Sequence, residues 1–372
     1  MAKRIKALCI TEDPDRPTTA MFVGLKDAGV DVTVVCPAGE RRAWLEANGV
    51  RVLDVVLRKQ FDRDAVRQLR AELEQGQYDV LHLFSNKALQ NGLAASRGLP
   101  VKVIAYRGIV GNVSFWSPVS WLRFLNPRID RIVCVANAVR EYFLQMRPAF
   151  LRVPAQRLVT IYKGHSLDWY RAAPADLVAL GVPAGSFAIA CVANYRPRKG
   201  IEVLVDAFGR LPAKLRAHLL LIGAGMDAPR LRQRIGASSV AERIHVLGFR
   251  TDAPALTAAC DVFVLPSTKR EGLARSLIEA MAYGVAPVVT DCGGSPELVE
   301  HGASGLIVPV GDAAALSAAL CALYDDAALR ARLGAAARAR IGRDFRIEDT
   351  IAKTLALYRV LAAEALAVPT AR

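Results

Sequence analysis

Short apolar runs, each about six residues long, recur along almost the whole chain, and an amphipathic segment follows each of them. In the first half they are rich in Val and Ile and occupy residues 5–10, 30–36, 50–56, 78–84, 101–106 and 131–136. Such runs are typical of strands buried on both faces of a parallel sheet. Between them lie segments with helical periodicity, as in 62–76, where Val66, Leu69 and Leu73 share one face. The alternation predicts a doubly wound α/β fold.

The pattern then restarts, which predicts a second domain of the same class. Its runs are residues 187–194, 217–225, 243–249, 260–266, 285–291 and 304–310. A Pro- and Gly-containing stretch from Lys163 to Ser186 separates the two series and is predicted to connect them. A length of 372 residues also suits two domains. We expect domains at 1–168 and 169–350 and a final helix within 351–372, with ligands bound outside the carboxyl ends of the strands.

The chain is strongly basic, with 49 Lys and Arg against 35 Asp and Glu and a net charge of +14. The first 170 residues carry 25 basic and 16 acidic residues, a net charge of +9. This excess favours an anionic partner, namely nucleic acid, a membrane surface or a phosphorylated substrate. A charge that merely keeps the protein soluble is the alternative.

The seven cysteines form no Cys-x-x-Cys pair, and most lie in strand-like runs. Zinc sites and disulfides are therefore not expected, and buried thiols in a reducing compartment are. The apolar stretch near the N-terminus fits a first strand rather than a signal peptide. No run approaches the roughly 18 apolar residues of a membrane-spanning helix. These features predict a cytoplasmic protein.

Two glutamates, Glu271 and Glu279, follow the run at 260–266 with seven residues between them. We expect Glu271 to stand just before a helix, with the N–H groups of Gly272 and Leu273 at the helix N-terminus, where a diphosphate can bind. Glu279 would lie two turns further along the same face. Its carboxylate could accept two hydrogen bonds from a ribose diol. Two surface glutamates on an amphipathic helix are the alternative.

A basic loop, residues 194–200, follows the first strand of the second series and contains Arg196 and Lys199. Two cations at the end of a strand suit a diphosphate and the charge of a leaving group. A solvated basic turn is the alternative. Gly223 lies in a short Gly-rich turn, which is a weak signal by itself.

The second half resembles the donor-binding domain of the retaining glycosyltransferases of family four. The resemblance rests on the Glu-x7-Glu segment 271–279, the loop ending in Lys199-Gly200, and residues 261–299. Residues 128–143 and 345–361 fit as well. It implies the GT-B fold, with two facing Rossmann-like domains and a last helix that crosses back to the first. It also implies retaining transfer of a sugar from a nucleoside diphosphate sugar, with no metal or other cofactor.

In that family's pattern, Glu271 contacts hydroxyl groups of the donor sugar, and Lys199 holds the diphosphate. Relatives usually have Gly-Arg directly after the strand, where this chain has Ala193-Asn194. Arg196 would then supply the missing cation from a shifted position. The resemblance assigns the donor to a group of residues in the second half: Glu279, Gly272, Leu273, Asn194, Gly223, Phe249 and Arg250.

The N-terminal half binds the acceptor in this family, and it offers two candidates for the catalytic site. Relatives often have a histidine after the strand at 101–106, and Arg107 occupies that place here. A fixed cation could bind an anionic group of acceptor or donor; a surface arginine is the alternative. His82 closes the run at 78–84, and a strand-end histidine with a structural hydrogen bond is its alternative.

The segment 113–124 contains Phe115, Trp116, Trp121 and Phe124 within the more basic half. Aromatic and basic residues together are typical of membrane interfaces, whereas ordinary packing is the alternative. An interface would fit a lipid-linked acceptor of the lipopolysaccharide or exopolysaccharide type. The protein would then lie peripherally at the inner face of an anionic membrane.

Two other classes of protein stay open. A nicotinamide-dependent oxidoreductase could also have two Rossmann-like domains, but no complete G-x-G-x-x-G follows the first strand. A nucleic-acid-binding protein is suggested by charge alone, and no motif for nucleic acid supports it. We therefore expect no nucleic-acid partner.

Overall fold

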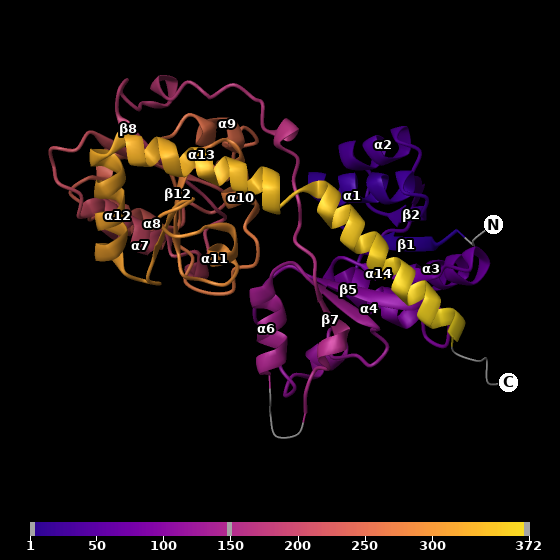
Figure 1. Ribbon diagram of the computed structural model, residues 1–372. Coiled ribbons are helices and arrows are strands. Elements are labelled where there is room, and N and C mark those ends of the chain that lie inside the picture. Colours follow the sequence, from indigo (N-terminus) through magenta and orange to yellow (C-terminus); the bar gives the residue numbers. More distant parts are fainter. Residues whose placement is uncertain (1–3, 147–150, 368–372) are drawn as a thin grey trace. The chain divides into compact units, whose positions relative to one another are not determined.

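The computed structural model describes residues 4–146 and 151–367 and contains two compact α/β units (Figure 1). The first unit comprises Met1–Gly164 and Arg346–Arg372, and the second His165–Phe345. The chain thus changes unit after residues 164 and 345, where the sequence suggested 168 and 350. Gly164 belongs to the first unit because its N–H donates to Thr350 Oγ1 at 2.8 Å. The N–H of His165 donates instead to the carbonyl of Phe345 in the second unit, at 2.7 Å.

The first unit is built on a parallel sheet in the order β3-β2-β1-β4-β5-β6-β7. Its strands are β1 (Lys6–Ile10), β2 (Asp31–Val35), β3 (Arg51–Leu53), β4 (Val80–Leu83), β5 (Lys102–Arg107), β6 (Arg131–Cys134) and β7 (Leu158–Thr160). All six apolar runs of the first series are strands, as predicted. The short strand β7 was not predicted, because LVT at the sheet edge is only half-buried and gives no long apolar run.

Helices follow most of these strands, as a doubly wound fold requires. They are α1 (Arg16–Asp27), α2 (Glu40–Ala47), α3 (Arg63–Gly76), α4 (Asn86–Ala95), α5 (Pro118–Trp121) and α6 (Asn137–Gln145), with a 3₁₀ turn at Ala155–Arg157. Helix α3 begins after Asp62, whose carboxylate accepts hydrogen bonds from the N–H groups of residues 64 and 65. Its buried residues are Ala65, Leu69 and Leu73, close to the predicted face.

The last helix, α14 (Ile347–Ala367, yellow in Figure 1), packs on the first unit, as the resemblance implied. Tyr358 of this helix is fully buried, and its hydroxyl contacts His82 of β4. Gly24 of α1 permits a close approach, since a Cβ atom there would lie 2.3 Å from Ile351 Cδ1. Arg131 at the start of β6 pairs with Glu364. The helix therefore forms part of the first unit's core.

The second unit has a six-stranded parallel sheet in the order β10-β9-β8-β11-β12-β13. Its strands are β8 (Phe187–Val192), β9 (Ala217–Ile222), β10 (Ile244–Gly248), β11 (Val262–Leu265), β12 (Ala286–Thr290) and β13 (Leu306–Val308). Its helices are α7 (Ile201–Gly209), α8 (Pro229–Gly236), α9 (Ala253–Ala258), α10 (Arg275–Ala282), α11 (Ser295–Leu298), α12 (Ala313–Asp325) and α13 (Ala327–Asp344), with 3₁₀ turns at Leu167–Trp169, Val178–Leu180, Pro197–Lys199 and Ala241–Arg243. All six predicted strands of the second series are confirmed.

The strand order of the second unit identifies where a ligand is expected. The order reverses between β8 and β11, which are neighbours in the sheet although β9 and β10 intervene in the chain. Ligands of open α/β sheets bind at such a switch point, outside the carboxyl ends of the strands. The loops that follow β8 and β11 are residues 193–200 and 266–274. They contain the basic loop and Glu271.

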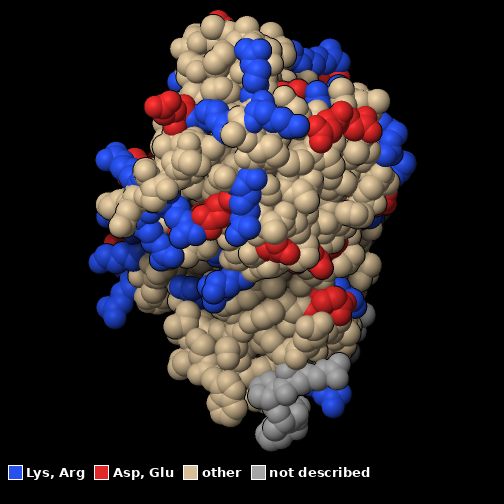
Figure 2. Space-filling view, turned by 90° about the vertical axis from the view of Figure 1, so that its left-hand side faces the viewer, with Lys and Arg blue, Asp and Glu red and all other residues tan. Residues whose placement is uncertain are grey.

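The basic excess is spread over the surface. On the face shown in Figure 2, Lys and Arg side chains are interleaved with Asp and Glu and are most frequent along the left-hand edge. Within the described part of the chain, none of the helices has both the length and the apolar character needed to cross a membrane.

Candidate active site

The centre of the candidate site is an ion pair between the two loops at the switch point. Lys199 Nζ lies 2.7 Å from Glu271 Oε2. Ser267 Oγ donates to the same carboxylate oxygen at 2.5 Å, and Glu271 is only 5% exposed. A buried carboxylate with two donors is fixed in place, because an unpaired charge would be costly there.

Glycines hold these loops close together. Gly200, which caps the turn containing Lys199, has φ +66°, and a Cβ atom there would lie 2.0 Å from the carbonyl oxygen of Pro266. Gly293 has φ +57°, and its Cβ atom would lie 2.1 Å from the carbonyl oxygen of Glu271. Thr268 N–H also donates to the Arg198 carbonyl at 2.8 Å. Loops after β8, β11 and β12 therefore form one packed backbone cluster around Glu271.

The structure corrects the expectation that Glu271 borders a helix whose face it shares with Glu279. Helix α10 begins at Arg275, so Glu271, Gly272 and Leu273 all belong to the preceding loop. Glu279 lies in the second turn of α10, and its Oε1 is 3.4 Å from Arg275 Nε. The chain between the glutamates is therefore a loop followed by a short helix, and Arg270 just before Glu271 is left-handed at φ +63°.

Asn194 and Gly223 join two further loops to this edge. Asn194 Oδ1 accepts a hydrogen bond from Ala224 N–H at 3.1 Å. Gly223 has φ +145°, and a Cβ atom there would lie 2.0 Å from the Ala193 carbonyl oxygen. Its N–H donates to the Gly248 carbonyl at 2.7 Å. Both residues therefore hold the backbone of these loops in place. Asn194 Oδ1 already accepts the hydrogen bond from Ala224 N–H, so a contact of this oxygen with the donor would have to share it.

Three other predicted donor-binding residues lie on exposed parts of these loops. Arg196 is exposed at the tip of the basic loop. Phe249 follows β10 and is 72% exposed, which is unusual for a large apolar side chain. Arg250 beside it makes a two-pronged ion pair with Asp252, at 2.8 and 2.6 Å. The structure thus places the predicted residues of the second half on loops along one edge of its sheet, except Glu279, which lies on α10.

The predicted catalytic role of His82 is not supported by its surroundings. The side chain lies in the middle of β4, is 1% exposed, and is covered by α14. Nδ1 is 2.9 Å from Tyr358 Oη, and the ring stacks on Phe84 at 4.1 Å between centroids. Burial lowers the pKa of His82 to about 3. His82 is a neutral core residue, which corrects our expectation.

Arg107 is also buried, which corrects the alternative that it is a surface residue. It ends β5, its Nε donates to the Ile109 carbonyl at 3.0 Å, and its Nη2 donates to the Gly111 carbonyl. The guanidinium also lies 4.7 Å from the centre of the Phe124 ring. Burial lowers the pKa of Arg107 to about 10, so it stays charged at neutral pH. Its contacts fix the loop that follows β5.

The sequence did not reveal two polar partners. Asp15 caps α1 and forms an ion pair with Lys163, whose Nζ is 3.1 and 2.9 Å from its carboxylate oxygens. Burial raises the pKa of Asp15, but the charge of Lys163 and hydrogen bonds from Thr18 outweigh it, and the pKa is lowered. The second partner that the sequence did not reveal is Ser267, which donates a hydrogen bond to Glu271. For Asp15, the one available signal was the Asp-x-x-Thr spacing, which is compatible with a helix N-cap.

No cluster of three or more His, Cys, Asp or Glu residues with metal-binding geometry occurs among residues 4–146 and 151–367.

Comparison with known proteins identifies the family. Residues 186–326 match the family model described as glycosyl transferases group 1, and residues 18–169 match that of glycosyltransferase family 4. A GDP-mannose-dependent monoacylated alpha-(1-6)-phosphatidylinositol monomannoside mannosyltransferase of Corynebacterium glutamicum is 35% identical over 274 residues, 68% of each chain. The chain belongs to glycosyltransferase family 4.

A second sequence relative of this glycosyltransferase agrees with the family, and a solved structure agrees with the fold. A lipopolysaccharide core biosynthesis mannosyltransferase of Rhizobium meliloti is 29% identical over 254 residues, 65% of this chain and 68% of that one. The crystal structure of the Anabaena protein HepE with UDP and glucose superposes with a TM-score of 0.78 at 24% identity and covers 95% of this chain and 100% of that chain. The protein has the GT-B fold. The oxidoreductase and nucleic-acid-binding alternatives are not favoured.

Proposed function

We propose that this glycosyltransferase moves a sugar from a nucleoside diphosphate sugar to a glycan or lipid-linked acceptor, with retention of the anomeric configuration. The observation that carries the proposal is the Lys199–Glu271 pair at the switch point of the second unit. It combines a cation for a diphosphate with a fixed carboxylate for sugar hydroxyl groups, in loops where this fold binds ligands.

In this proposal each residue of the second unit has a distinct task. Lys199 and the exposed Arg196 would bind the diphosphate and stabilise the charge that develops on it as the glycosidic bond breaks. Glu271 and the backbone amides of Gly272 and Leu273 would bind the sugar. Glu279 would accept hydrogen bonds from the ribose hydroxyls. These cations would supply the positive charge, so the proposal includes no metal ion and no other cofactor.

The reaction would proceed on one face of the sugar. The bond from the anomeric carbon to the diphosphate oxygen breaks while the bond to the acceptor oxygen forms. The proton of the acceptor hydroxyl passes to the departing diphosphate. Because this base belongs to the donor, the step needs no neutral histidine, and this fits the buried position of His82. Stabilisation of the leaving group by preorganised cations would be the main contribution to rate.

The acceptor is proposed to be lipid-linked, of the lipopolysaccharide or exopolysaccharide type, which would bring the protein to the inner face of a membrane. Both mannosyltransferases named above act, by their names, in the assembly of glycolipids or lipopolysaccharide. The net charge of +14 suits an anionic surface.

A thermal-shift panel of UDP, GDP, ADP and CMP sugars tests the donor class. We expect one nucleotide to raise the melting temperature of the wild type and not of Lys199→Ala. Proton NMR of the product then gives its anomeric configuration. An inverted product, or no shift with any nucleotide sugar, would contradict the proposal.

A further inference from the structure

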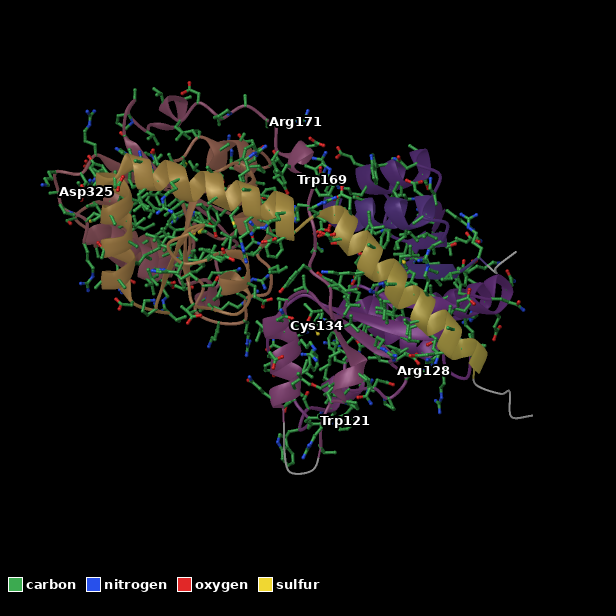
Figure 3. All side chains as sticks on the ribbon, viewed as in Figure 1. Trp121, Arg128, Cys134, Trp169, Arg171 and Asp325 are labelled. Atoms are coloured by element: carbon green, nitrogen blue, oxygen red, sulfur yellow. The ribbon has the colours of Figure 1, made fainter. Side chains whose placement is uncertain are left out.

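A group of large apolar side chains is exposed on the first unit. It consists of two Trp, one Phe, one Leu and one Val, which we call the aromatic surface: Phe61, Trp116, Val119, Trp121 and Leu122. Trp116 is 85% exposed, Leu122 59% and Phe61 54%. Figure 3 shows Trp121 at the margin of this unit. Soluble proteins rarely expose so many bulky apolar groups together unless the surface binds something.

Two separate segments form this surface, and polar contacts join them. Arg123 Nη2 donates to Gln60 Oε1 at 3.1 Å and to Gln90 Oε1 at 3.3 Å. Residue 60 precedes Phe61, and residue 123 follows Leu122. The contact between residues 60 and 123 therefore makes the segment of Phe61 and the segment of Leu122 neighbours. The buried Asn91 of α4 fixes the first segment, since its Oδ1 accepts from Asp62 N–H at 2.7 Å and its Nδ2 donates to the Gln60 carbonyl at 3.2 Å.

The second segment, residues 114–122, is equally well ordered by its own contacts. Trp121 Nε1 donates to the Phe115 carbonyl at 2.8 Å, and the two rings lie 5.8 Å apart. Ser120 Oγ accepts from Ser114 N–H at 3.1 Å. Below this segment Phe124 is buried against the guanidinium of Arg107. The side chains are therefore held outward by a fixed backbone, and little ordering is needed when they bind.

Exposed basic side chains lie next to the aromatic surface in the sequence. Residues 80–129 contain no Asp or Glu and six basic residues, of which Lys87, Lys102 and Arg128 form ion pairs with Glu12 or Asp130 and Arg107 is buried. Arg58 and Lys59 precede Phe61 and are exposed. Asp62, which follows Phe61, accepts hydrogen bonds from the N–H groups of residues 58, 64 and 65. Exposed indoles beside the exposed side chains of Arg58 and Lys59 match the interface of an anionic bilayer, where rings enter the headgroup layer and cations meet lipid phosphates.

We propose that the aromatic surface docks the protein on an anionic lipid membrane, with Trp116 and Leu122 inserted into the headgroup region. This inference rests on the proposed lipid-linked acceptor, since docking would bring the acceptor-binding unit to the membrane that carries it. We propose lipid rather than a second copy of the chain as the partner. In a symmetric dimer through this surface, the cations of one copy would face the same cations of the other.

Flotation of the full chain with vesicles tests the proposal. We expect the wild type to bind vesicles of phosphatidylcholine with phosphatidylglycerol, and to bind pure phosphatidylcholine much less. Trp116→Ser with Leu122→Ser should lower the partition coefficient by about tenfold or more. Arg58→Glu with Lys59→Glu should lower binding to anionic vesicles and weaken its salt dependence. The control is Trp44→Ser, since Trp44 lies on α2 and is 41% exposed, like Trp121 at 40%.

Three results would overturn the docking proposal. They are no binding of the wild type to anionic vesicles at low salt, unchanged binding of the Trp116→Ser, Leu122→Ser variant, or a wild-type dimer that this variant dissociates. The last result would assign the surface to a second copy. Nucleotide-sugar thermal shifts on the same samples separate this outcome from the proposed function. A wild type that shifts but does not float overturns docking alone, whereas one that floats without any shift contradicts the donor proposal alone.

Discussion

Lys199 Nζ and Glu271 Oε2 lie 2.7 Å apart although the two residues are 72 positions apart in the chain. Their contact depends on β8 and β11 being neighbours in the sheet, which brings the two following loops to one point. Bound diphosphate would attract the same ammonium group that now pairs with the carboxylate. The pair therefore holds both groups in place before the donor arrives.

Removing either partner of this pair should lower turnover without unfolding the protein. We expect Glu271→Gln and Lys199→Ala each to reduce kcat by about 10²–10³-fold, by analogy with the loss of one preorganised charge-stabilising group. The double variant should lose much less than the product of the two, because the residues act together. Arg234→Ala is the control, since Arg234 pairs with Asp206 on the exposed surface of the same unit. Near-normal activity of both single variants would reject the assignment.

The packing of the loops around Glu271 should depend on Gly200. We expect Gly200→Ala to destabilise the second unit by about 2 kcal/mol more than Gly302→Ala, because its Cβ atom would meet the Pro266 carbonyl at 2.0 Å. Gly302 has a similar φ of +73° but no neighbour within 4 Å, so it isolates the cost of the left-handed backbone. Urea unfolding of both variants measures the difference, and equal destabilisation would contradict the steric argument.

His82 should make the first unit less stable in acid. Its pKa is about 3 when folded and near 6.5 when unfolded. The unfolded chain therefore binds the proton first, and the stability due to neutral His82 is complete above pH 6.5 and lost between pH 6.5 and 3. Its contribution is about 1.4 kcal/mol per pH unit in that window.

Two variants isolate this effect. His82→Asn keeps a polar atom near Tyr358 Oη and removes the titration, so its stability deficit relative to the wild type should shrink as the pH falls. Tyr358→Phe should be destabilised but keep the wild-type pH slope. Hydrogen exchange of the β4 amides follows the first unit separately. If His82→Asn and the wild type had parallel pH profiles, the buried neutral histidine would be disproved.

Arg107 should order the loop after β5. We expect Arg107→Ala to cost about 2 kcal/mol, as for a lost charged hydrogen bond, and to speed amide exchange over residues 109–113. Arg107→Lys keeps the charge but loses the planar group that reaches both carbonyls, so it should behave more like Ala than like the wild type. A lysine variant with wild-type exchange rates would show that charge alone is sufficient.

Phe249 should stack against the base of the donor. Its exposed ring lies on the loop after β10, which the loop after β9 contacts through Gly223 N–H and the Gly248 carbonyl. We expect Phe249→Ala to weaken nucleotide binding about tenfold or more, as for other base–aromatic stacks. Calorimetry with the nucleotide identified in the thermal-shift panel measures this. Val246→Ala on β10, also at a partly exposed position, should leave the affinity unchanged.

The periodicity of the sequence determined the fold class, because buried strands and amphipathic helices are recorded in local patterns of apolar residues. Twelve of the thirteen strands could be predicted in this way, and so could the two series of βα units. The position of Glu271 and Lys199 on loops at one edge of the second sheet could be predicted as well, since both residues come a few positions after predicted strands, and strand ends of parallel sheets meet at one edge.

Only the tertiary structure decided what each polar side chain does. His82 and Arg107 also stand at predicted strands, yet α14 covers the first, and the carbonyls of residues 109 and 111 occupy the second. The surroundings of His82 depend on a helix hundreds of residues away in the chain, and those of Arg107 depend on the path of the following loop. Local sequence patterns show neither the helix contact nor the loop path. Burial distinguishes these two residues from those of the candidate site. A polar or charged group that is excluded from water must form its hydrogen bonds with the protein itself.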